Sequence, residues 1–393
     1  MRSRLQCIVN EGIKSAVSFT HDLGSLKYIF FLLISLHLVL GVFFLPLFSS
    51  DFERNLFYGE AFWKHGFQVY DMTPLEIDPG YSIGDPTSGI LSYPNTTFDY
   101  PTLQLLFWVG IAALPFPQIT AKWILSIFDI FNTILIFELL KRFSRNENGS
   151  EKSELFEKGF ALSYLLFAIP FSAIEGQSTS ITIFFFLISI ALYSRNNQAS
   201  YLAVGLGFHW KYVTLLILPY LLVKDIGSVK KMLSGLGYLV GSLILLSFPL
   251  FYSQFILSYF SFFGNLSQYS GQIPSNPLLI SKLYISSILS TGMLLLGIFF
   301  WLKPVLRNKK ISFDIQGIID RGYWIPLLLL LLFLKIYANS FPWYWMWFYS
   351  LIVILPRKDR RLFTKLFAIT FAFGLVDFVD MTVGFETFFG FFS

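Results

Sequence analysis

The stretch "YIFFLLISLHLVLGVFFLPLFSSDFERNLFYGEAFWKHG", residues 28–66, joins a long apolar run to a charged segment. The apolar run is long enough to cross a bilayer, which takes about 20 such residues. The first charge after it is Asp51, at the point where a membrane helix would meet water. Residues 51–66 then place apolar side chains such as Phe52 and Leu56 at helical spacing. We therefore expect a second helix here that lies on the membrane surface.

The composition of the whole chain is also typical of a membrane protein. The chain has 393 residues, of which 55% are hydrophobic and only 13% charged, and its mean hydropathy is +0.62. Soluble domains carry about 25% charged residues. The single cysteine, Cys7, excludes an internal disulfide and a cysteine-based metal site. No nucleotide-binding motif occurs, and in a membrane protein the net charge of +5 reflects topology before nucleic-acid binding.

The apolar runs predict an all-α polytopic membrane protein that forms one integral membrane domain over residues 1–393. We expect about eleven transmembrane segments. They lie near 28–49, 101–116, 120–140, 159–174, 178–194, 200–222, 233–251, 282–302, 322–337, 341–355 and 364–385.

Lysine and arginine in short loops predict the orientation of these segments, because such loops stay in the cytoplasm. The stretches that are basic in this way are 223–231, 303–310 and 356–365, and the N-terminus joins them. Alternation then makes 50–100 the first long external loop and 252–281 the second.

One loop conflicts with that orientation. Residues 141–158, "KRFSRNENGSEKSELFEK", are rich in Lys and Arg but fall outside by alternation. Three N-x-[ST] sequons favour the alternation nevertheless, because Asn95, Asn148 and Asn265 all fall in loops that it assigns to the outside.

Ionisable residues inside membrane segments are the default functional candidates, because an unpaired charge there costs several kcal/mol. These residues are Asp129, Glu138, Glu175, His209, Lys211, Lys335, Asp377 and Asp380. Lys122 and Glu138 sit near segment ends, where their side chains can reach the interface. Lys211 is the strongest buried cation and needs an anionic partner, either a carboxylate such as Asp129 or a ligand phosphate.

The polar stretch "AIEGQSTSIT", residues 173–182, separates two short apolar runs around Glu175 and Gln177. It fits two interpretations. The runs form a hairpin whose polar tip lies inside the membrane and lines a cavity, or the tip is an ordinary cytoplasmic turn.

Four stretches occur in an order that resembles the GT-C membrane glycosyltransferases, which use polyprenyl-phosphate-linked sugars. They are the aspartate-aromatic pair after the first helix with Gly66 and Tyr70, "FDYPTLQLLFW", the long stretch from "EGQSTS" to "FHWKYVTLLILPYLL", and "SFPWYWMWFYSLIVILP". The chain looks closest to the polyprenol-phosphate-mannose-dependent mannosyltransferases, including the catalytic subunit of GPI mannosyltransferase I. It departs from some relatives in having "SSD" in place of D-x-D, and Trp343 and Tyr344 in place of a histidine.

The resemblance implies an inverting transfer of mannose from a polyprenyl (dolichyl) phosphate to a lipid-linked or surface glycan. Asp51 would be the general base. Lys211, His209 and Lys335 would bind the donor phosphate, and the substrate cleft would be lined by Asp99, Tyr100, Glu175, Gln177, Asn276, Trp343 and Tyr344. At 1.5 Å per residue, Lys211 would lie about 16 Å below the outer end of its helix, which is deep for a lipid headgroup.

The implied surroundings are a cell or endoplasmic reticulum membrane, with the active site on the non-cytoplasmic side. No cofactor is required, and a divalent metal ion is compatible with the family. The partners would be the lipid-linked donor, the glycan acceptor, membrane lipids and a small membrane subunit, with no nucleic acid. Three alternatives stay open. They are another GT-C activity, with a different sugar or a whole oligosaccharide, a lipid or glycolipid transporter or flippase, and a catalytically silent relative that binds lipid.

Overall fold

The computed structural model describes residues 17–43, 50–83, 94–95, 97–145, 151–247, 288, 291–303, 321–337, 342–355, 360, 364–365 and 368. Within these ranges the chain forms helices and no strand, so the prediction of an all-α protein is confirmed there. Four of the described helices are long and apolar enough to cross a membrane, namely Val17–Phe43, Pro117–Phe143, Leu155–Ile174 and Val229–Ser247. The count of eleven segments stays a prediction.

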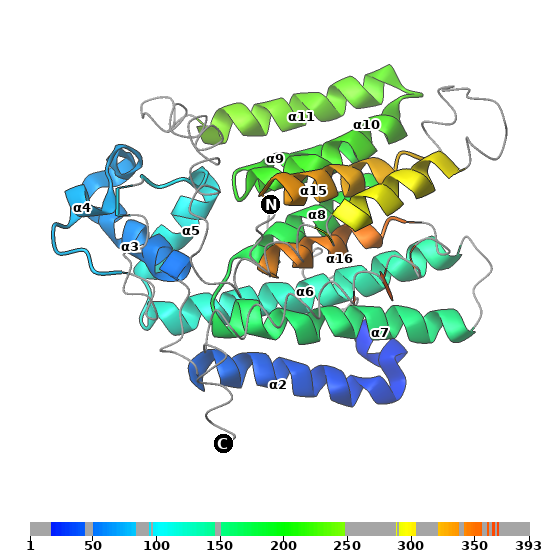
Figure 1. The fold of residues 1–393 in the computed structure, drawn as a ribbon, viewed down its shortest axis with the longest axis horizontal. Helices are drawn as coiled ribbons and strands as arrows, with labels where there is room; N and C mark the ends of the chain where they lie inside the picture. Colours follow the sequence, from blue (N-terminus) through cyan, green and yellow to red (C-terminus); the bar gives the residue numbers. More distant parts are fainter. Residues whose placement is uncertain are drawn as a thin grey trace, which may run out of the picture.

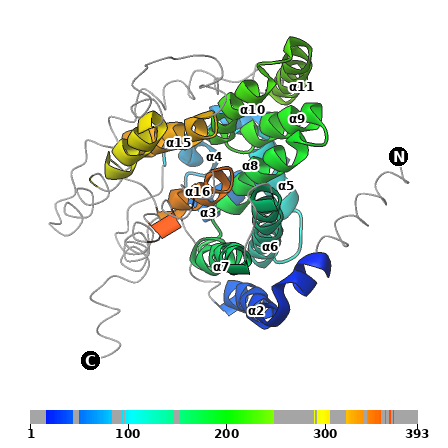
Figure 2. The same ribbon diagram turned by 90° about the vertical axis from the view of Figure 1, so that its right-hand side faces the viewer.

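Most helices lie side by side in one bundle (Figure 1). They are α2 (Lys27–Phe43), α6 (Pro117–Arg145), α7 (Glu151–Ala168), α8 (Thr179–Tyr193), α9 (Asn197–Phe208), α10 (Leu218–Asp225), α11 (Val229–Ser247), α15 (Trp324–Tyr337) and α16 (Trp347–Ile352). Figure 2, which looks along the bundle, shows α2, α7, α6, α8, α9 and α11 in a curved row with α16 against its inner side. One large apolar core joins these helices.

A smaller group of helices covers one end of the bundle, and we call it the lobe (Figure 1). It contains α3 (Ser50–His65), η2 (Gly66–Asp71), α4 (Pro74–Ile77) and α5 (Thr102–Ala112). A Cβ on Gly59 would stand 2.5 Å from the carbonyl oxygen of Trp108, so only glycine allows α3 to approach α5 this closely. Phe52 meets the same tryptophan edge-on at 5.1 Å between ring centroids. The apolar stripe of α3 therefore faces protein, and not lipid as a surface helix would.

The short helix α5 changes the expected topology. Eleven residues span about 16 Å, well short of the roughly 30 Å of a bilayer core, and the whole of α5 lies within the lobe (Figure 1). Helix α6 then runs away from the lobe, so its last residues lie at the far end of the bundle. The sequence predicts that 50–100 and 141–158 share one side, whereas the described residues 50–83 and 141–145 lie at opposite ends of the bundle. If those ends mark the two sides of the membrane, the basic residues of 141–145 lie on the side that the Lys/Arg rule favours.

The far end of the bundle, which we call the basic end, is held by polar contacts between helix termini. Arg142 at the end of α6 donates to Ala191 O at 3.2 Å and to Ser194 Oγ at 2.7 Å, beyond α8. Lys141 forms an ion pair with Asp22. These contacts place the ends of α6 and α8 together. Further basic residues at this end are Arg195, Lys224, Lys230 and Lys231.

The expected segment 200–222 is not one helix. Helix α9 ends at Phe208, Lys211 has extended backbone angles (φ −155°, ψ 120°), and the chain resumes as η4 (Tyr212–Ile217) and α10. Lys211 therefore lies at a break between helices that opens toward the lobe, so the expected depth along one continuous helix does not apply.

Candidate active site

Asp51 lies in the first turn of α3, where the helix dipole favours a carboxylate. Its side chain is partly buried. Burial raises the pKa of the Asp51 carboxyl above its usual range, Arg54 and Lys211 oppose that rise, and Asp99 adds to it. Within the described part of the chain, no hydrogen bond or ion pair engages this carboxylate. It is a base without a fixed partner.

Arg54, one helical turn after Asp51, fixes the neighbouring loop in place. Its buried guanidinium donates to Asp99 Oδ1 at 3.0 Å and to the carbonyl oxygen of Thr97 at 2.8 Å, and lies 5.6 Å from the ring centroid of Tyr58. Asp99 is thus the paired carboxylate of the site and Asp51 the unpaired one. Sequence reasoning missed Arg54, although a charge on the apolar side of a predicted amphipathic helix was a usable signal.

Lys211 sits in a cage of three aromatic rings, although it comes from a distant part of the chain. Its Nζ lies 4.9 Å from the ring centroid of Tyr344, 5.4 Å from that of Tyr100 and 5.6 Å from that of Trp347. The residue is only 5% exposed. Aromatic faces attract a cation without neutralising its charge, so the ammonium group stays available to an anion.

The alternative partner for Lys211 is ruled out within the described residues. Asp129 lies deep in the bundle, where Tyr164 Oη donates to its Oδ1 at 2.7 Å and His37 Nε2 stands 3.8 Å from its Oδ2. No ion pair joins Asp129 to Lys211 in the described structure. The interpretation of a Lys211–Asp129 pair is wrong.

The turn at 175–178 packs against α3 and brings a further carboxylate to the site. Gly176 has φ +72°, and a Cβ there would stand 2.3 Å from Cδ2 of Phe52, the residue next to Asp51. Glu175 is 5% exposed, its Oε2 has no hydrogen-bond partner, and it interacts electrostatically with Asp51 and Lys122. The turn therefore lies at the same end of the bundle as Asp51.

The other side of this turn is tied to the segment that carries Lys211. Trp210 Nε1 donates to the carbonyl oxygen of Ser178 at 3.2 Å, and Gln104 Nε2 donates to Ser178 Oγ at 3.4 Å. Gln177 is buried beside it, with its backbone N–H donating to Phe171 O at 2.8 Å. Three segments far apart in sequence thus meet at one point.

His209 is positioned away from this group. Its Nε2 lies 3.2 Å from the carbonyl oxygen of Leu243 on α11, and the side chain is buried. The predicted residues that the structure brings together are Asp51, Asp99, Tyr100, Glu175, Lys211 and Tyr344. Asn276 lies outside the described residues, as do the side chains of Lys335 and Trp343 and both Asp377 and Asp380.

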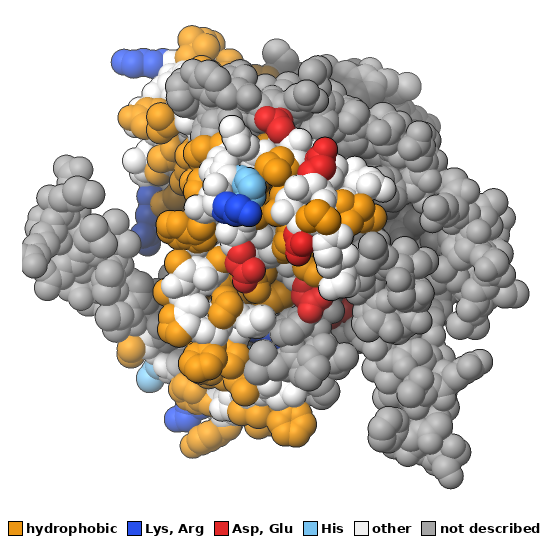
Figure 3. Space-filling model, turned by 90° about the vertical axis from the view of Figure 1, so that its left-hand side faces the viewer, with side chains coloured by type: hydrophobic (Ala, Val, Ile, Leu, Met, Phe, Trp, Pro, Cys, Tyr) orange, Lys and Arg blue, Asp and Glu red, His pale blue; other side chains and the backbone are white. Residues whose placement is uncertain are grey.

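The outer surface of the lobe is acidic, whereas the cations of the site are buried (Figure 3). Besides Asp51, the carboxylates that are exposed or partly exposed on α3, η2, α4 and the turn after it are Glu53, Glu60, Asp71, Glu76 and Asp78, against Lys64 as the exposed cation of α3. A free anion in solution is therefore repelled from this face. An anion carried by a lipid is held near the bundle and does not have to cross that surface.

The site offers a carboxylate base beside a buried ammonium group, a combination suited to transfer onto a hydroxyl from an anionic leaving group. Within the described ranges, no three or more His, Cys, Asp or Glu side chains gather so as to hold a metal ion. The comparisons with known proteins add no further constraint, because no family model, no curated protein and no solved structure matches the chain.

Proposed function

We propose that the protein is a GT-C-type membrane glycosyltransferase, which moves mannose from a polyprenyl-phosphate donor to a hydroxyl of a lipid-linked or surface glycan with inversion. One observation carries this proposal: Asp51 and Lys211 meet at the lobe end of the bundle, and neither is neutralised by a protein partner in the described structure. An unpaired base and an unpaired cation in one place are costly for folding. The presence of both groups in the folded protein supports a role for Asp51 and Lys211 in the same reaction.

The proposed reaction uses both groups in a single displacement. Asp51 takes the proton from the acceptor hydroxyl while its oxygen attacks the anomeric carbon. The bond from that carbon to the phosphate oxygen breaks, and its electron pair stays on the lipid phosphate. Lys211 stabilises the charge that develops there. Arg54 holds Asp99 and the 97–100 segment so that the cage residue Tyr100 stays next to Lys211.

The charge distribution supports a non-cytoplasmic site. Lys141, Arg142, Lys224 and Lys231 lie at the end opposite the lobe, and the Lys/Arg rule assigns such a basic end to the cytoplasm. We therefore propose that the lobe and Asp51 face the opposite side of the membrane, where a lipid-linked sugar can reach the site from the bilayer.

The test is a transfer assay on membranes that contain the chain, supplied with a lipid acceptor and with labelled polyprenyl-phosphate-mannose, or with the glucose or arabinose analogue. We expect mannose transfer by the wild type, loss of transfer in Asp51→Asn, and normal transfer in Glu60→Gln, which removes an exposed carboxylate of the same helix. Transfer of another sugar would replace mannose as the proposed donor sugar and keep the proposed roles of Asp51 and Lys211. Equal transfer by Asp51→Asn and the wild type would overturn the assignment of the base.

A transporter or flippase is the second candidate, and one observation favours it. The structure holds a buried pair of ionisable side chains, Asp129 and His37, outside the candidate site, and intramembrane ionisable groups of this kind line the paths of some transporters. If vesicles with the chain moved a polyprenyl-phosphate sugar across the bilayer but transferred none to an acceptor, this candidate would replace the first.

A further inference from the structure

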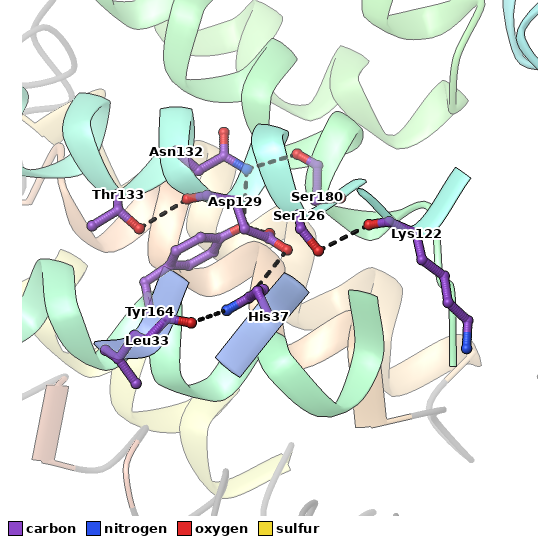
Figure 4. A network of polar contacts seen from close by, with 9 residues as sticks. All are labelled: Leu33, His37, Lys122, Ser126, Asp129, Asn132, Thr133, Tyr164 and Ser180. Carbon is purple, nitrogen blue, oxygen red and sulfur yellow. Dashed lines mark hydrogen bonds and ion pairs between the residues drawn. The ribbon is translucent and has the colours of Figure 1, made fainter. Parts of the chain in front are cut away.

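A network of buried polar side chains joins α2, α6, α7 and α8 in the middle of the bundle, and the proposed reaction does not use it (Figure 4). Asn132 Nδ2 donates to Tyr164 Oη at 2.8 Å and to the carbonyl oxygen of Ser180 at 2.7 Å. Tyr164 in turn donates to Asp129 Oδ1 at 2.7 Å. The chain of donors thus ends at one oxygen of Asp129 and leaves its other oxygen, Oδ2, without a hydrogen-bond partner.

His37 on α2 faces that free oxygen. Its Nδ1 lies 2.9 Å from the carbonyl oxygen of Leu33, and a carbonyl oxygen only accepts, so Nδ1 carries a hydrogen. In a neutral imidazole the other nitrogen, Nε2, is then an acceptor. Among the described residues Nε2 has no hydrogen-bond partner, and it stands 3.8 Å from Asp129 Oδ2, with both residues fully buried. Without a further proton, two acceptors would face each other.

We infer that Asp129 and His37 together bind one proton, carried either by Asp129 Oδ2 or by His37 Nε2, so that they form a buried protonation site whose ligand is H⁺. With that proton the pair carries no net charge, whether the proton resides on the carboxyl or makes the imidazole cationic. The protonated and deprotonated states are therefore properties of the pair, and neither can be assigned to one residue alone. Without it, an ionised carboxylate would stand in the apolar core beside a lone pair, an arrangement that costs several kcal/mol.

The groups around the pair agree with one bound proton, because none of those described is a cation that would neutralise Asp129. The polar neighbours of Asp129 are Tyr164 from α7 and the Ser172 hydroxyl from η3 (Ile169–Ile174). The nearest cation on the same helix, Lys122, interacts with Glu175 instead. No ion pair with a lysine or arginine neutralises Asp129 in the described part of the chain. The pair also joins α2, which carries His37, to α6, which carries Asp129. The chain that follows α2 leads to Asp51, the candidate base.

The shared proton has a consequence for stability. In the unfolded chain the pair keeps one proton only below the ordinary histidine pKa of about 6.5, because the aspartate is already ionised. Above that pH the folded state binds more protons than the unfolded state, so the pair's contribution to stability falls as pH rises. Asp129→Asn puts an N–H donor in place of the shared proton and keeps an acceptor for Tyr164. It should therefore fold normally and lose this part of the pH dependence.

The test combines spectroscopy on the wild type with melting curves in detergent. Infrared and ¹⁵N-histidine NMR spectra at neutral pH should show either a protonated Asp129 carboxyl or a doubly protonated His37. An ionised carboxylate beside a neutral imidazole would overturn the inference, whether a water or a metal ion lies between them. The melting temperature of the wild type should fall from pH 6.5 to 9 more steeply than that of Asp129→Asn.

Asp225→Asn is the matched control, because this buried carboxylate already receives hydrogen bonds from Tyr193, Tyr201 and Asn197. It should lower the melting temperature but keep the wild-type slope with pH. Equal slopes for the wild type and Asp129→Asn would contradict the shared proton. Because neither measurement uses sugar transfer, the inference stands or falls independently of the proposed enzyme activity.

Discussion

The two ends of the bundle treat their charges differently. At the basic end, Asp225 accepts hydrogen bonds from Tyr193 at 2.8 Å and Tyr201 at 3.0 Å, and Lys141 pairs with Asp22. At the lobe end, no hydrogen bond or ion pair to a described residue engages Asp51 or Lys211, and aromatic rings surround the Lys211 ammonium group. The comparison separates charges that hold helices together from charges kept available for a ligand. Only the second kind is expected to carry chemistry.

The largest effect should come from Asp51. Replacing it by Asn removes the proposed base at nearly constant shape, and general-base catalysis contributes about 10²–10⁴-fold. We expect a loss of that size in the rate of labelled mannose transfer. Stability should not fall, because burial already disfavours the charged form of this carboxyl. Glu60→Gln, an exposed change on the same helix, is the control, and a similar loss there would mean that any carboxylate on α3 matters.

Lys211→Met should have the next largest effect. Methionine fills the aromatic cage but cannot stabilise the charge that develops on the phosphate, and one such group contributes about 10²–10³-fold. Lys224→Met at the basic end is the matched control, because Lys224 also lies over an aromatic ring, 5.6 Å from the Tyr220 centroid, but is exposed. If both variants transferred sugar at the wild-type rate, the difference between the two ends would have no catalytic meaning.

Asp225→Ala should lower stability and leave the rate of sugar transfer unchanged, which is the reverse of the effect expected for Asp51→Asn. The change removes the acceptor of the Tyr193 and Tyr201 hydroxyls at the basic end, and unsatisfied buried groups cost about 1–3 kcal/mol. The free energy of unfolding, measured by denaturant titration in detergent, should fall by that amount. The specific activity of the protein that remains folded should not change. A selective loss of activity would show that the basic end is more than structural.

The smallest effect is a shift in the pH profile. A base must be ionised to work, so activity should be lost as pH falls through the pKa of Asp51, which burial raises above that of an ordinary aspartate. Arg54 opposes that rise, so Arg54→Gln should move the acid limb of kcat/KM to higher pH. Lys64→Gln, which removes an exposed cation of the same helix, should leave the limb in place. An acid limb at lower pH in Arg54→Gln would contradict the proximity of the two groups.

The sequence was sufficient to predict an all-α chain with helices long enough to cross a membrane, and the structure brings several of the predicted site residues together. Long apolar runs fix helices because a bilayer leaves few alternatives. Asp51 and Lys211 stand out in the sequence as charges that follow or interrupt such runs, whereas Asp99 is implied by the family resemblance. The single histidine that failed to join them, His209, bonds a backbone carbonyl of α11. The apolar residues around His209 in the sequence do not show whether its ring faces the candidate site or α11.

The topology needed the structure. Length and hydropathy do not distinguish a short helix that crosses from one that packs in a lobe, so α5 was counted as a span. The break before Lys211 was also hidden, because η4 and α10 continue the apolar pattern of α9. Arg54 was missed because its partners, Asp99 and Thr97, lie far away in sequence. Contacts of that range are set by packing and not by local pattern.

The most direct test of the central claim is to separate donor binding from chemistry at the lobe end. Equilibrium binding of labelled polyprenyl-phosphate-mannose would be measured for purified wild type, Asp51→Asn and Lys211→Met in nanodiscs, followed by a single-turnover reaction with acceptor. We predict that Asp51→Asn binds the donor as the wild type does and forms no product, while Lys211→Met binds more weakly and reacts slowly. Donor binding that is unaffected by Lys211→Met, together with product formation by Asp51→Asn, would contradict the account.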